Sequence, residues 1–303
     1  MAKAEFTRKN IKNPKTTVIN DDNVWLIPTN TLELVPFCLP HNYSLMKEET
    51  TPALTPATTP LHAAWNWSLS SLNEQSWVKN ISDSESSTRY PIKLLRYWFM
   101  FNLIKEQQQR LGRPLRVCEI GVDRGQMCRY VQDAGFTDIA CWEAVDYKLQ
   151  TELSESGYTK QIQANVDLPE FALAEKYDVI IVLHLLEHLF EPENLVMKLA
   201  PALEADGILI GGFPAVPQII QAYRQEKIRK TAANFGHVST FSPQRVKNMA
   251  QQCGLNMDFL SGTYMLRKRN FFLENSPFWV RLNLLWGVLF PAFSGELYWC
   301  MRK

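Results

Sequence analysis

The feature that most constrains this chain is a regular alternation of apolar, strand-like runs with amphipathic helical segments, which begins at Pro91. The helical segments repeat apolar residues three or four positions apart, whereas the strand-like runs are short and continuously apolar. Alternation of this kind indicates a parallel sheet with helices on both faces. The sequence therefore predicts a doubly wound α/β fold. Its strand candidates are LRVCEI, DIACWEAV, KQIQA, YDVIIVL and GILIGGF, and two more near 257–266 and 297–302.

The predicted helices of this region are marked by residues that start and stop helices. A first helix, YPIKLLRYWFMFNLIKEQQQ, is ended by Gly112-Arg113-Pro114. A further helix carries Leu195, Leu199 and Leu203 on one face. The last helix of the alternation begins after Ser242 as N-cap, with Pro243 at its first position, and ends at Gly254.

Residues 1–90 differ from the rest and are predicted to form an N-terminal extension, with the main domain at 91–303. The segment TTPALTPATTP is typical of a linker, and SLSSLNEQSWVKNISDSESS is polar with isolated tryptophans. We expect Trp65, Trp67 and Trp77 to dock onto the main domain, and the alternative is partial disorder.

Charge and cysteine usage exclude several classes of protein. The formal net charge of the 303 residues is +1, and the sequence has neither a basic stripe interleaved with aromatic residues nor a base-binding motif, so no nucleic-acid partner is expected. The six cysteines show no Cys-x-x-Cys pair or other metal-ligand spacing, so no metal site is predicted and free thiols are expected.

The N-terminal residues lack the apolar run of a secretory signal, which predicts a cytoplasmic protein. The sequence does not indicate an oligomeric state.

The most apolar segment, residues 278–301, does not have the pattern of a membrane-spanning helix. Arg281, Asn283, Pro291 and Glu296 interrupt it. A helix buried against the domain is the preferred interpretation, and peripheral membrane contact through residues 278–294 is the alternative.

The stretch VCEIGVDRGQ, residues 117–126, lies where the first strand of such a fold turns towards its cofactor. Gly121 and Gly125 allow the backbone to approach a ligand closely. A dinucleotide fingerprint starting at Gly121 requires further glycines where the chain has Asp123 and Gln126, and a carboxylate there repels a pyrophosphate. Glu119 and Asp123 instead suit a cationic cofactor, and S-adenosylmethionine carries a sulfonium and an ammonium group but no phosphate.

This turn resembles the first motif of class I S-adenosylmethionine-dependent methyltransferases, E/D-x-G-x-G-x-G, with Asp123 in place of the middle glycine. The resemblance implies that Glu119, Gly121, Asp123 and Gly125 bind S-adenosylmethionine. It also implies that the seven-stranded sheet ends in an antiparallel C-terminal hairpin.

Further stretches resemble the same family between Leu115 and Leu266, and most closely its small-molecule members of the ubiquinone-biosynthesis O-methyltransferase type. AGFTDIACWE resembles the second strand, which implies Glu143 as the acid that binds the ribose hydroxyls, with Asp146 as the competing candidate. NVDLP resembles the region after the third strand, where Asn165 or Asp167 contacts the adenine.

The stretch from Tyr177 to Pro192 resembles the fourth strand and following turn of the family, which implies that Leu183 lies at the cofactor. Two later stretches resemble the fifth strand and the entry to the last helix. They are LEADGILIGGFP and GHVSTFSP.

Methyl transfer is an in-line displacement, so the protein chiefly orients its substrates and excludes water. An oxygen acceptor benefits from a general base, and an imidazole has a suitable pKa. His184 and His237 are the candidate bases, because both are expected on the cofactor side of the sheet; packing roles are the alternative. The predicted function is methylation of an oxygen in a small-molecule, glycan or lipid-linked acceptor. The alternative is a catalytically degenerate methyltransferase fold that acts as a binding module.

Overall fold

The computed structural model describes residues 58–73, 88–231, 236–265 and 271–303. Within these ranges the strands that form the sheet are β1 (Leu115–Ile120), β2 (Ile139–Asp146), β3 (Lys160–Gln163), β4 (Tyr177–Leu183), β5 (Leu203–Pro214), β6 (Asn256–Thr263) and β7 (Glu296–Arg302). They lie in the order β3-β2-β1-β4-β5-β7-β6. Strands β1 to β5 are parallel, and β7 pairs antiparallel with β5 and β6. The predicted seven-stranded sheet with an antiparallel C-terminal hairpin is confirmed.

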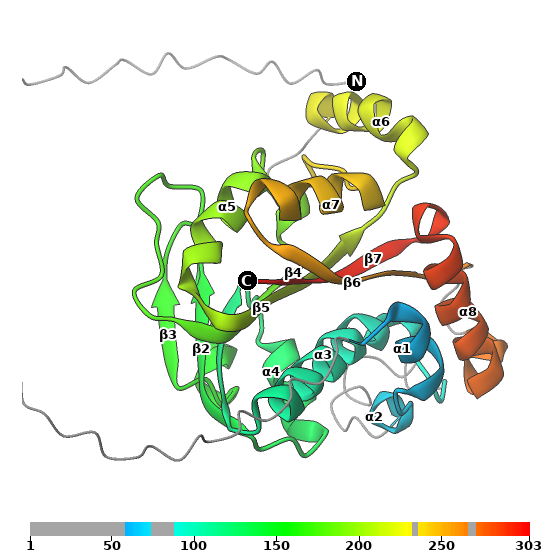
Figure 1. Cartoon of the computed structure of the whole chain (residues 1–303), viewed down its shortest axis with the longest axis horizontal. Helices are drawn as coiled ribbons and strands as arrows, with labels where there is room; N and C mark the ends of the chain where they lie inside the picture. Colours follow the sequence, from blue (N-terminus) through cyan, green and yellow to red (C-terminus); the bar gives the residue numbers. More distant parts are fainter. Residues whose placement is uncertain (1–57, 74–87, 232–235, 266–270) are drawn as a thin grey trace, which may run out of the picture. The chain divides into compact units, whose positions relative to one another are not determined.

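Helices cover both faces of this sheet. They are α1 (Pro60–Asn66), α2 (Ser70–Asn73), α3 (Leu95–Leu111), α4 (Gln126–Asp133), α5 (Pro192–Leu199), α6 (Gln218–Thr231), α7 (Pro243–Gln252) and α8 (Pro277–Leu289). Figure 1 shows α1 to α4 and α8 on one face and α5 and α7 on the other, with α6 beyond α7. Two separate hydrophobic clusters fill the layers between helices and sheet. Short 3-10 turns complete the described structure: η2 (Ile92–Leu94), η3 (Thr151–Glu155), η4 (Leu186–His188), η5 (Ala200–Ala202), η6 (Phe272–Asn275) and η7 (Pro291–Phe293).

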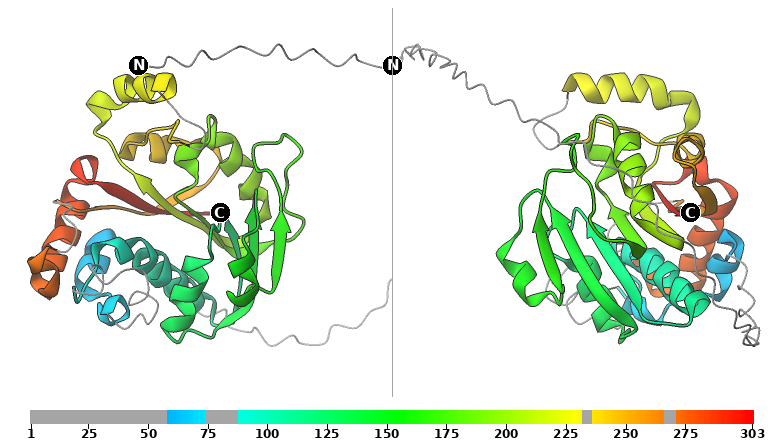
Figure 2. Two further views of the ribbon diagram at one scale, coloured as in Figure 1. Left: turned by 180° about the vertical axis from the view of Figure 1, so that it is seen from behind. Right: turned by 60° about the vertical axis from the view of Figure 1, so that its left-hand side comes forward.

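The order of the strands determines where a ligand binds. From β1 the chain moves outwards through β2 and β3, and then returns to the other side of β1 to form β4. The connections that leave β1 and β4 therefore diverge, and a crevice opens beyond their carboxyl ends. The right-hand view in Figure 2 shows the parallel strands of the sheet side by side.

The residues predicted to begin and end helices do so in the structure, with one exception. The Ser242 hydroxyl accepts a hydrogen bond from the Arg245 amide at 3.3 Å, and Gly254 has a positive φ of 67° after the end of α7. The prediction that Leu203 continues the helix of Leu195 and Leu199 was wrong. Helix α5 ends at Leu199, because Pro201 cannot donate a helical hydrogen bond, and Leu203 begins β5.

Residues 58–73, which belong to the predicted extension, pack into the core between α3 and the C-terminal region. The Trp67 ring stacks on Phe259 with centroids 5.6 Å apart and meets Trp98 edge-on at 5.4 Å. Its indole nitrogen donates a 2.7 Å hydrogen bond to Glu106. The expected docking is confirmed for Trp67, whereas Trp65 is 50% exposed. Trp77 and most of the Thr/Pro-rich segment lie outside the described residues.

The apolar segment near the C-terminus forms α8, which packs against α1 and β6. Arg281, which interrupts the apolar run, donates hydrogen bonds to the carbonyl oxygens of Ala64 and Trp67. The predicted helix buried against the domain is confirmed for this face of α8. None of the described helices is long and apolar enough to cross a membrane. Peripheral membrane contact through 278–294 stays a prediction.

The packing of Trp67 predicts that Trp67→Ala lowers the free energy of unfolding by about 3–5 kcal/mol, because a large buried ring is replaced by a cavity. The matched control, Trp65→Ala, is expected to change it by less than about 0.5 kcal/mol, since that ring is half exposed. Urea denaturation of both variants measures the difference. Equal, small losses in the two variants would show that residues 58–73 are not part of the folded core.

Candidate functional site

The loop that follows β1 carries three residues with left-handed backbone conformation. Gly121, Asp123 and Gly125 have φ values of 77°, 47° and 71°. Glycine adopts this region without strain, and aspartate is among the few other residues that tolerate it. Asp123 therefore adopts the left-handed conformation between the two glycines, as a glycine at this position could.

Asp146 connects this loop to the next strand. It is the last residue of β2, and its Oδ2 accepts a hydrogen bond of 3.1 Å from the Asp123 amide. Its Oδ1 accepts a second hydrogen bond of 3.1 Å from the Lys148 amide. The carboxylate is thereby fixed beside the Gly121–Gly125 loop at the carboxyl edge of the sheet, where an acid can accept hydrogen bonds from ribose hydroxyls.

The position of Glu143 does not fit the role predicted for it. Glu143 lies in the middle of β2, paired with Cys118 of β1, three residues before the end of the strand. It is buried, and its carboxylate accepts a 2.8 Å hydrogen bond from the Tyr177 hydroxyl. Asp146, at the end of β2, is therefore the better placed of the two candidates, and the assignment of the ribose acid stays a prediction.

Glu119, the penultimate residue of β1, is a buried acid beneath the loop. Burial raises its pKa to about 8, although the Tyr158 hydroxyl, which donates a 2.8 Å hydrogen bond to Oε2, acts in the opposite direction. Asp146 also raises the pKa of Glu119. The carboxyl is thus mostly protonated at neutral pH, and a cation placed near it would favour loss of the proton.

The other predicted cofactor residues occupy the ends of β3 and β4. The Asn165 side chain accepts a 3.0 Å hydrogen bond from the Asp167 amide and so forms a turn just after β3. Asp167 is exposed and lines a cavity of about 700 Å³ between this turn and α5. Leu183 ends β4 and is partly buried.

His184 follows β4 and lies between two carboxylates. Its backbone has a positive φ of 55°. The ring Nδ1 is 3.0 Å from Oε1 of Glu187, and Nε2 is 3.8 Å from Oε2 of Glu296. Burial alone would lower the pKa of His184, but these two carboxylates outweigh it and raise the pKa.

Sequence analysis missed Arg96 and Glu296, which complete this buried cluster. Arg96, at the start of α3, forms a 3.2 Å ion pair with Glu296, the first residue of β7. The Tyr298 hydroxyl also donates to Glu296. Burial alone would raise the pKa of Glu296, but His184 and Arg96 lower it to about 2. Two residues 200 positions apart share no local motif, so no sequence signal marked them as partners.

His237, the second candidate base, does not contact His184. Its exposed ring meets that of His188 edge-on, with centroids 4.9 Å apart. Burial and the neighbouring His188 lower the pKa of His237, and Glu187 opposes the shift. Glu187 thus lies near both candidate bases: its Oε1 is 3.0 Å from Nδ1 of His184, and one of its carboxylate oxygens is within 4.8 Å of a ring nitrogen of His237.

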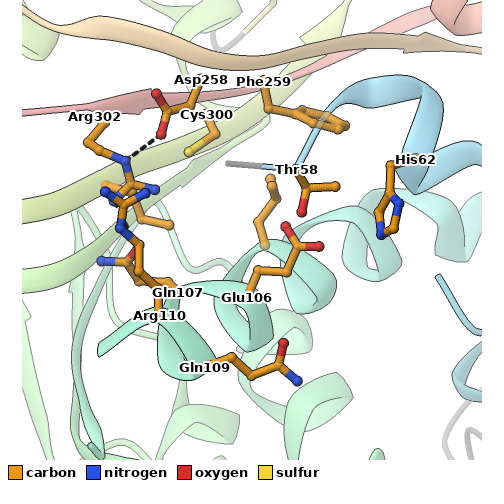
Figure 3. A pocket seen from close by; sticks show the side chains of 12 residues that line it. Thr58, His62, Glu106, Gln107, Gln109, Arg110, Asp258, Phe259, Cys300 and Arg302 are labelled. Atoms are coloured by element: carbon orange, nitrogen blue, oxygen red, sulfur yellow. Dashed lines mark hydrogen bonds and ion pairs between the residues drawn. The ribbon is translucent and has the colours of Figure 1, made fainter. Parts of the chain in front are cut away.

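A further cavity, of about 340 Å³, lies at the opposite edge of the sheet (Figure 3). Arg302, the last residue of β7, lines it and forms an ion pair with Asp258. Arg302 also donates hydrogen bonds to the Gln107 side chain and to the Asp206 carbonyl, at 3.0 and 2.8 Å. In a parallel sheet the ligand crevice lies at the other ends of the strands, so this cavity is not the candidate cofactor site.

Comparison with known proteins identifies the class. A family model described as a methyltransferase domain matches residues 94–258. No curated protein matches the chain. Because the family model covers more than half of the chain, the chain belongs to this family. It is an S-adenosylmethionine-dependent methyltransferase.

Solved structures with a similar fold have low sequence identity to this chain. A 1,6-didemethyltoxoflavin-N1-methyltransferase of Burkholderia thailandensis, with bound S-adenosylhomocysteine, is 14% identical over 67% of this chain and 76% of that chain, with a TM-score of 0.42. The N-methyltransferase NodS of Bradyrhizobium japonicum, also with S-adenosylhomocysteine, is 13% identical over 76% and 98%, with a TM-score of 0.45. The magnesium protoporphyrin IX methyltransferase of Synechocystis is 14% identical over 69% and 84%, with a TM-score of 0.41.

The residues at the crevice fit S-adenosylmethionine. The loop after β1 has the required left-handed turns, and a side chain on Gly125 would come within 2.8 Å of the Ser156 hydroxyl oxygen. The acids Glu119, Asp123 and Asp146 suit a cofactor that carries positive charge and ribose hydroxyls. Bound there, this cofactor supplies an electrophilic methyl group.

The geometry of β2 predicts different effects for its two acids. Asp146→Asn is expected to weaken S-adenosylhomocysteine binding at least about tenfold, because it removes charge-assisted hydrogen bonds to the ribose. Glu143→Gln, the matched control, is expected to change the affinity less than about twofold, since that side chain bonds to Tyr177. Isothermal titration calorimetry measures both. Loss of S-adenosylhomocysteine binding only in Glu143→Gln would show that Glu143, as predicted from the sequence, binds the ribose hydroxyls.

The raised pKa of Glu119 predicts that cofactor binding releases a proton. At pH 7 the free chain holds Glu119 mostly protonated, because this pH lies below its pKa of about 8. Pairing with the cofactor's ammonium group lowers that pKa, so about one proton leaves for each S-adenosylhomocysteine bound. The affinity for S-adenosylhomocysteine then increases as the pH is raised, and it levels off above a pH of about 8.

Calorimetric titrations with S-adenosylhomocysteine at pH 7, in buffers with different ionisation enthalpies, measure the number of protons released. The Glu119→Gln variant should release no proton on binding. Equal proton release by the wild type and Glu119→Gln would rule out Glu119 as its source.

Proposed function

We propose that this methyltransferase transfers the methyl group to an oxygen of a small molecule, with His184 accepting the acceptor's proton. The observation that carries the proposal is the arrangement of His184 between Glu187 and Glu296 at the end of β4. Strand β4 is central in the sheet and adjoins β1, whose loop forms the cofactor site. The imidazole is therefore on the edge of the sheet where an acceptor would meet the methyl group.

A hydroxyl acceptor becomes a much better nucleophile as its proton is removed. Glu187 contacts Nδ1 of His184, which orients the ring and leaves Nε2 for the proton. Nε2 is buried and has no hydrogen-bond partner among the described residues. After proton transfer, Glu187 and Glu296 would stabilise the imidazolium between them. This pairing of an imidazole with a carboxylate is the usual arrangement of a histidine general base.

The insertion after β5 is proposed to form the wall of the acceptor pocket. It contains α6, whose Gln221 and Gln225 donate hydrogen bonds to the carbonyl oxygens of Thr240 and Val238. These contacts connect α6 to the loop that carries His237. Helix α6 has no buried residues, and Ile219 is 91% exposed, so its position over the site depends on polar contacts of this kind.

Two basic side chains of α6, those of Arg229 and Lys230, have partners within the protein. Arg229 donates a 2.9 Å hydrogen bond to the Phe190 carbonyl, and Lys230 pairs with Glu226 one turn earlier. Both are engaged in local contacts at the protein surface. The proposal is restricted to a small-molecule acceptor, and the glycan and lipid-linked acceptors expected from sequence stay predictions.

The test combines an acceptor screen with two histidine variants. Small phenols, alcohols, amines and carboxylates are incubated with the enzyme and methyl-labelled S-adenosylmethionine, and mass spectrometry locates the methyl group. We expect products methylated at oxygen. His184→Asn should lower kcat for the best acceptor by about 10²–10⁴-fold, while S-adenosylhomocysteine affinity is unchanged.

His62→Asn, at an exposed position on α1, serves as the matched control and should leave kcat unchanged. His237→Asn tests the second candidate base in the same assay. Methylation at nitrogen would contradict the proposed acceptor. A larger loss of kcat in His237→Asn than in His184→Asn would assign the proton transfer to His237.

A further inference from the structure

We propose that Glu187, His188 and His237 bind a divalent transition-metal ion, with Zn²⁺ as the chemically best-matched ion. One ligand atom from each of these side chains lies within 4.8 Å of the other two. Glu187 and His188 belong to η4, directly after β4, and His237 comes from the loop before α7. This inference does not depend on the identity of the methyl acceptor.

The carboxylate of Glu187 gives the first independent indication of a missing partner. The residue is 1% exposed. His184 occupies its Oε1, whereas Oε2 is buried and has no hydrogen-bond partner among the described residues. An unpaired carboxylate oxygen in a buried position costs free energy, so a cation beside it would resolve the deficit.

The hydrogen bond made by His188 prepares its ring to coordinate a metal. Nδ1 of His188 is 3.3 Å from the carbonyl oxygen of Gly236. A carbonyl only accepts hydrogen bonds, so Nδ1 carries the proton, and in the neutral ring Nε2 carries the lone pair. Histidine ligands of metal ions usually have this second hydrogen bond, which fixes the orientation and the tautomer of the ring.

The backbone holds the two halves of the site together. The amides of Val238 and Ser239 both donate to the carbonyl oxygen of Glu187, at 2.8 and 3.0 Å. The Ser239 hydroxyl donates a further 2.7 Å hydrogen bond to the Leu189 carbonyl. The loop that carries His237 is therefore fixed against η4 at three points. An ion about 2.1 Å from each ligand keeps the ligand atoms about 3–4 Å apart, so side-chain movements of about 1 Å complete the site.

The donor set determines which ion fits. Two imidazoles and one carboxylate match Zn²⁺ in sites that keep an open coordination position, and they also suit Co²⁺ and Mn²⁺. Mg²⁺ prefers oxygen ligands in octahedral geometry and is a poor match. Coordination occupies a lone pair of His237, which then cannot take the acceptor's proton, so the role of base falls to His184.

The site escaped prediction from sequence because its ligands come from segments about fifty residues apart. The pair Glu187-His188 is too short to be a metal motif by itself, and His237 stands alone in its loop. The fold brings the two segments together through the contacts between η4 and the loop before α7.

Isothermal titration of the metal-free full-length protein with ZnCl₂, under reducing conditions, tests the proposal. We expect one Zn²⁺ per chain with micromolar or tighter affinity, and MgCl₂ binding at least about 100-fold more weakly. His237→Ala, at an exposed position that tolerates substitution, should weaken Zn²⁺ binding at least about tenfold, as should Glu187→Gln. His62→Ala, the matched control on α1, should bind Zn²⁺ as the wild type does.

Substitution with CoCl₂ gives a second readout that separates these ligands from the cysteines. The bound Co²⁺ should show ligand-field absorption without the intense charge-transfer band of a thiolate ligand. Absence of stoichiometric Zn²⁺ binding, or binding that is unchanged in His237→Ala, would overturn the proposal. A thiolate band that persists in His237→Ala would place the ion on cysteine and would also overturn it.

Discussion

The left-handed backbone between Gly121 and Gly125 is the constraint on which the rest of the site depends. It turns the chain sharply at the end of β1 and directs the Asp123 amide towards Asp146, at the end of β2. This hydrogen bond, together with the 2.8 Å hydrogen bond from the Gly121 amide to the Val145 carbonyl, fixes two adjacent parts of the crevice relative to each other. The order of the strands then places β4 on the other side of the same loop. The cofactor site and the proposed acceptor site are therefore neighbours because of the topology of the sheet.

Charge is distributed unequally between these two sites. The cofactor side presents acids, of which Glu119 is buried and has its pKa raised by that burial. The side proposed for the acceptor holds the ion pair of Arg96 with Glu296, and His184 lies between Glu296 and Glu187. Removing one member of such a set leaves an uncompensated buried charge. We infer that the cofactor supplies the positive charge that the first group lacks. In the second group Arg96 pairs with Glu296, whereas one carboxylate oxygen of Glu187 has no hydrogen-bond partner among the described residues.

The fold was predictable from sequence because it depends on local patterns. Continuous apolar runs marked the strands, and Ser242, Pro243 and Gly254 marked α7 correctly. The glycine-containing turn was also visible, since its function requires particular residues in consecutive positions. Which acid of β2 lies at the cofactor edge was not visible, because Glu143 and Asp146 are only three residues apart and strand pairing is needed to show that Glu143 is inside the strand. Ion pairs such as that between Arg96 and Glu296 join segments that are distant in the sequence, so no local motif predicts them.

The most direct test of the account is a crystal structure of the full-length protein with S-adenosylhomocysteine. The account predicts that the ligand lies over the Gly121–Gly125 loop, with its ribose hydroxyls on Asp146 and its ammonium group beside Glu119. It also predicts that the sulfur faces the end of β4, where His184 lies. Ribose hydroxyls bound to Glu143, or a ligand in the cavity lined by Arg302 at the opposite edge of the sheet, would contradict it.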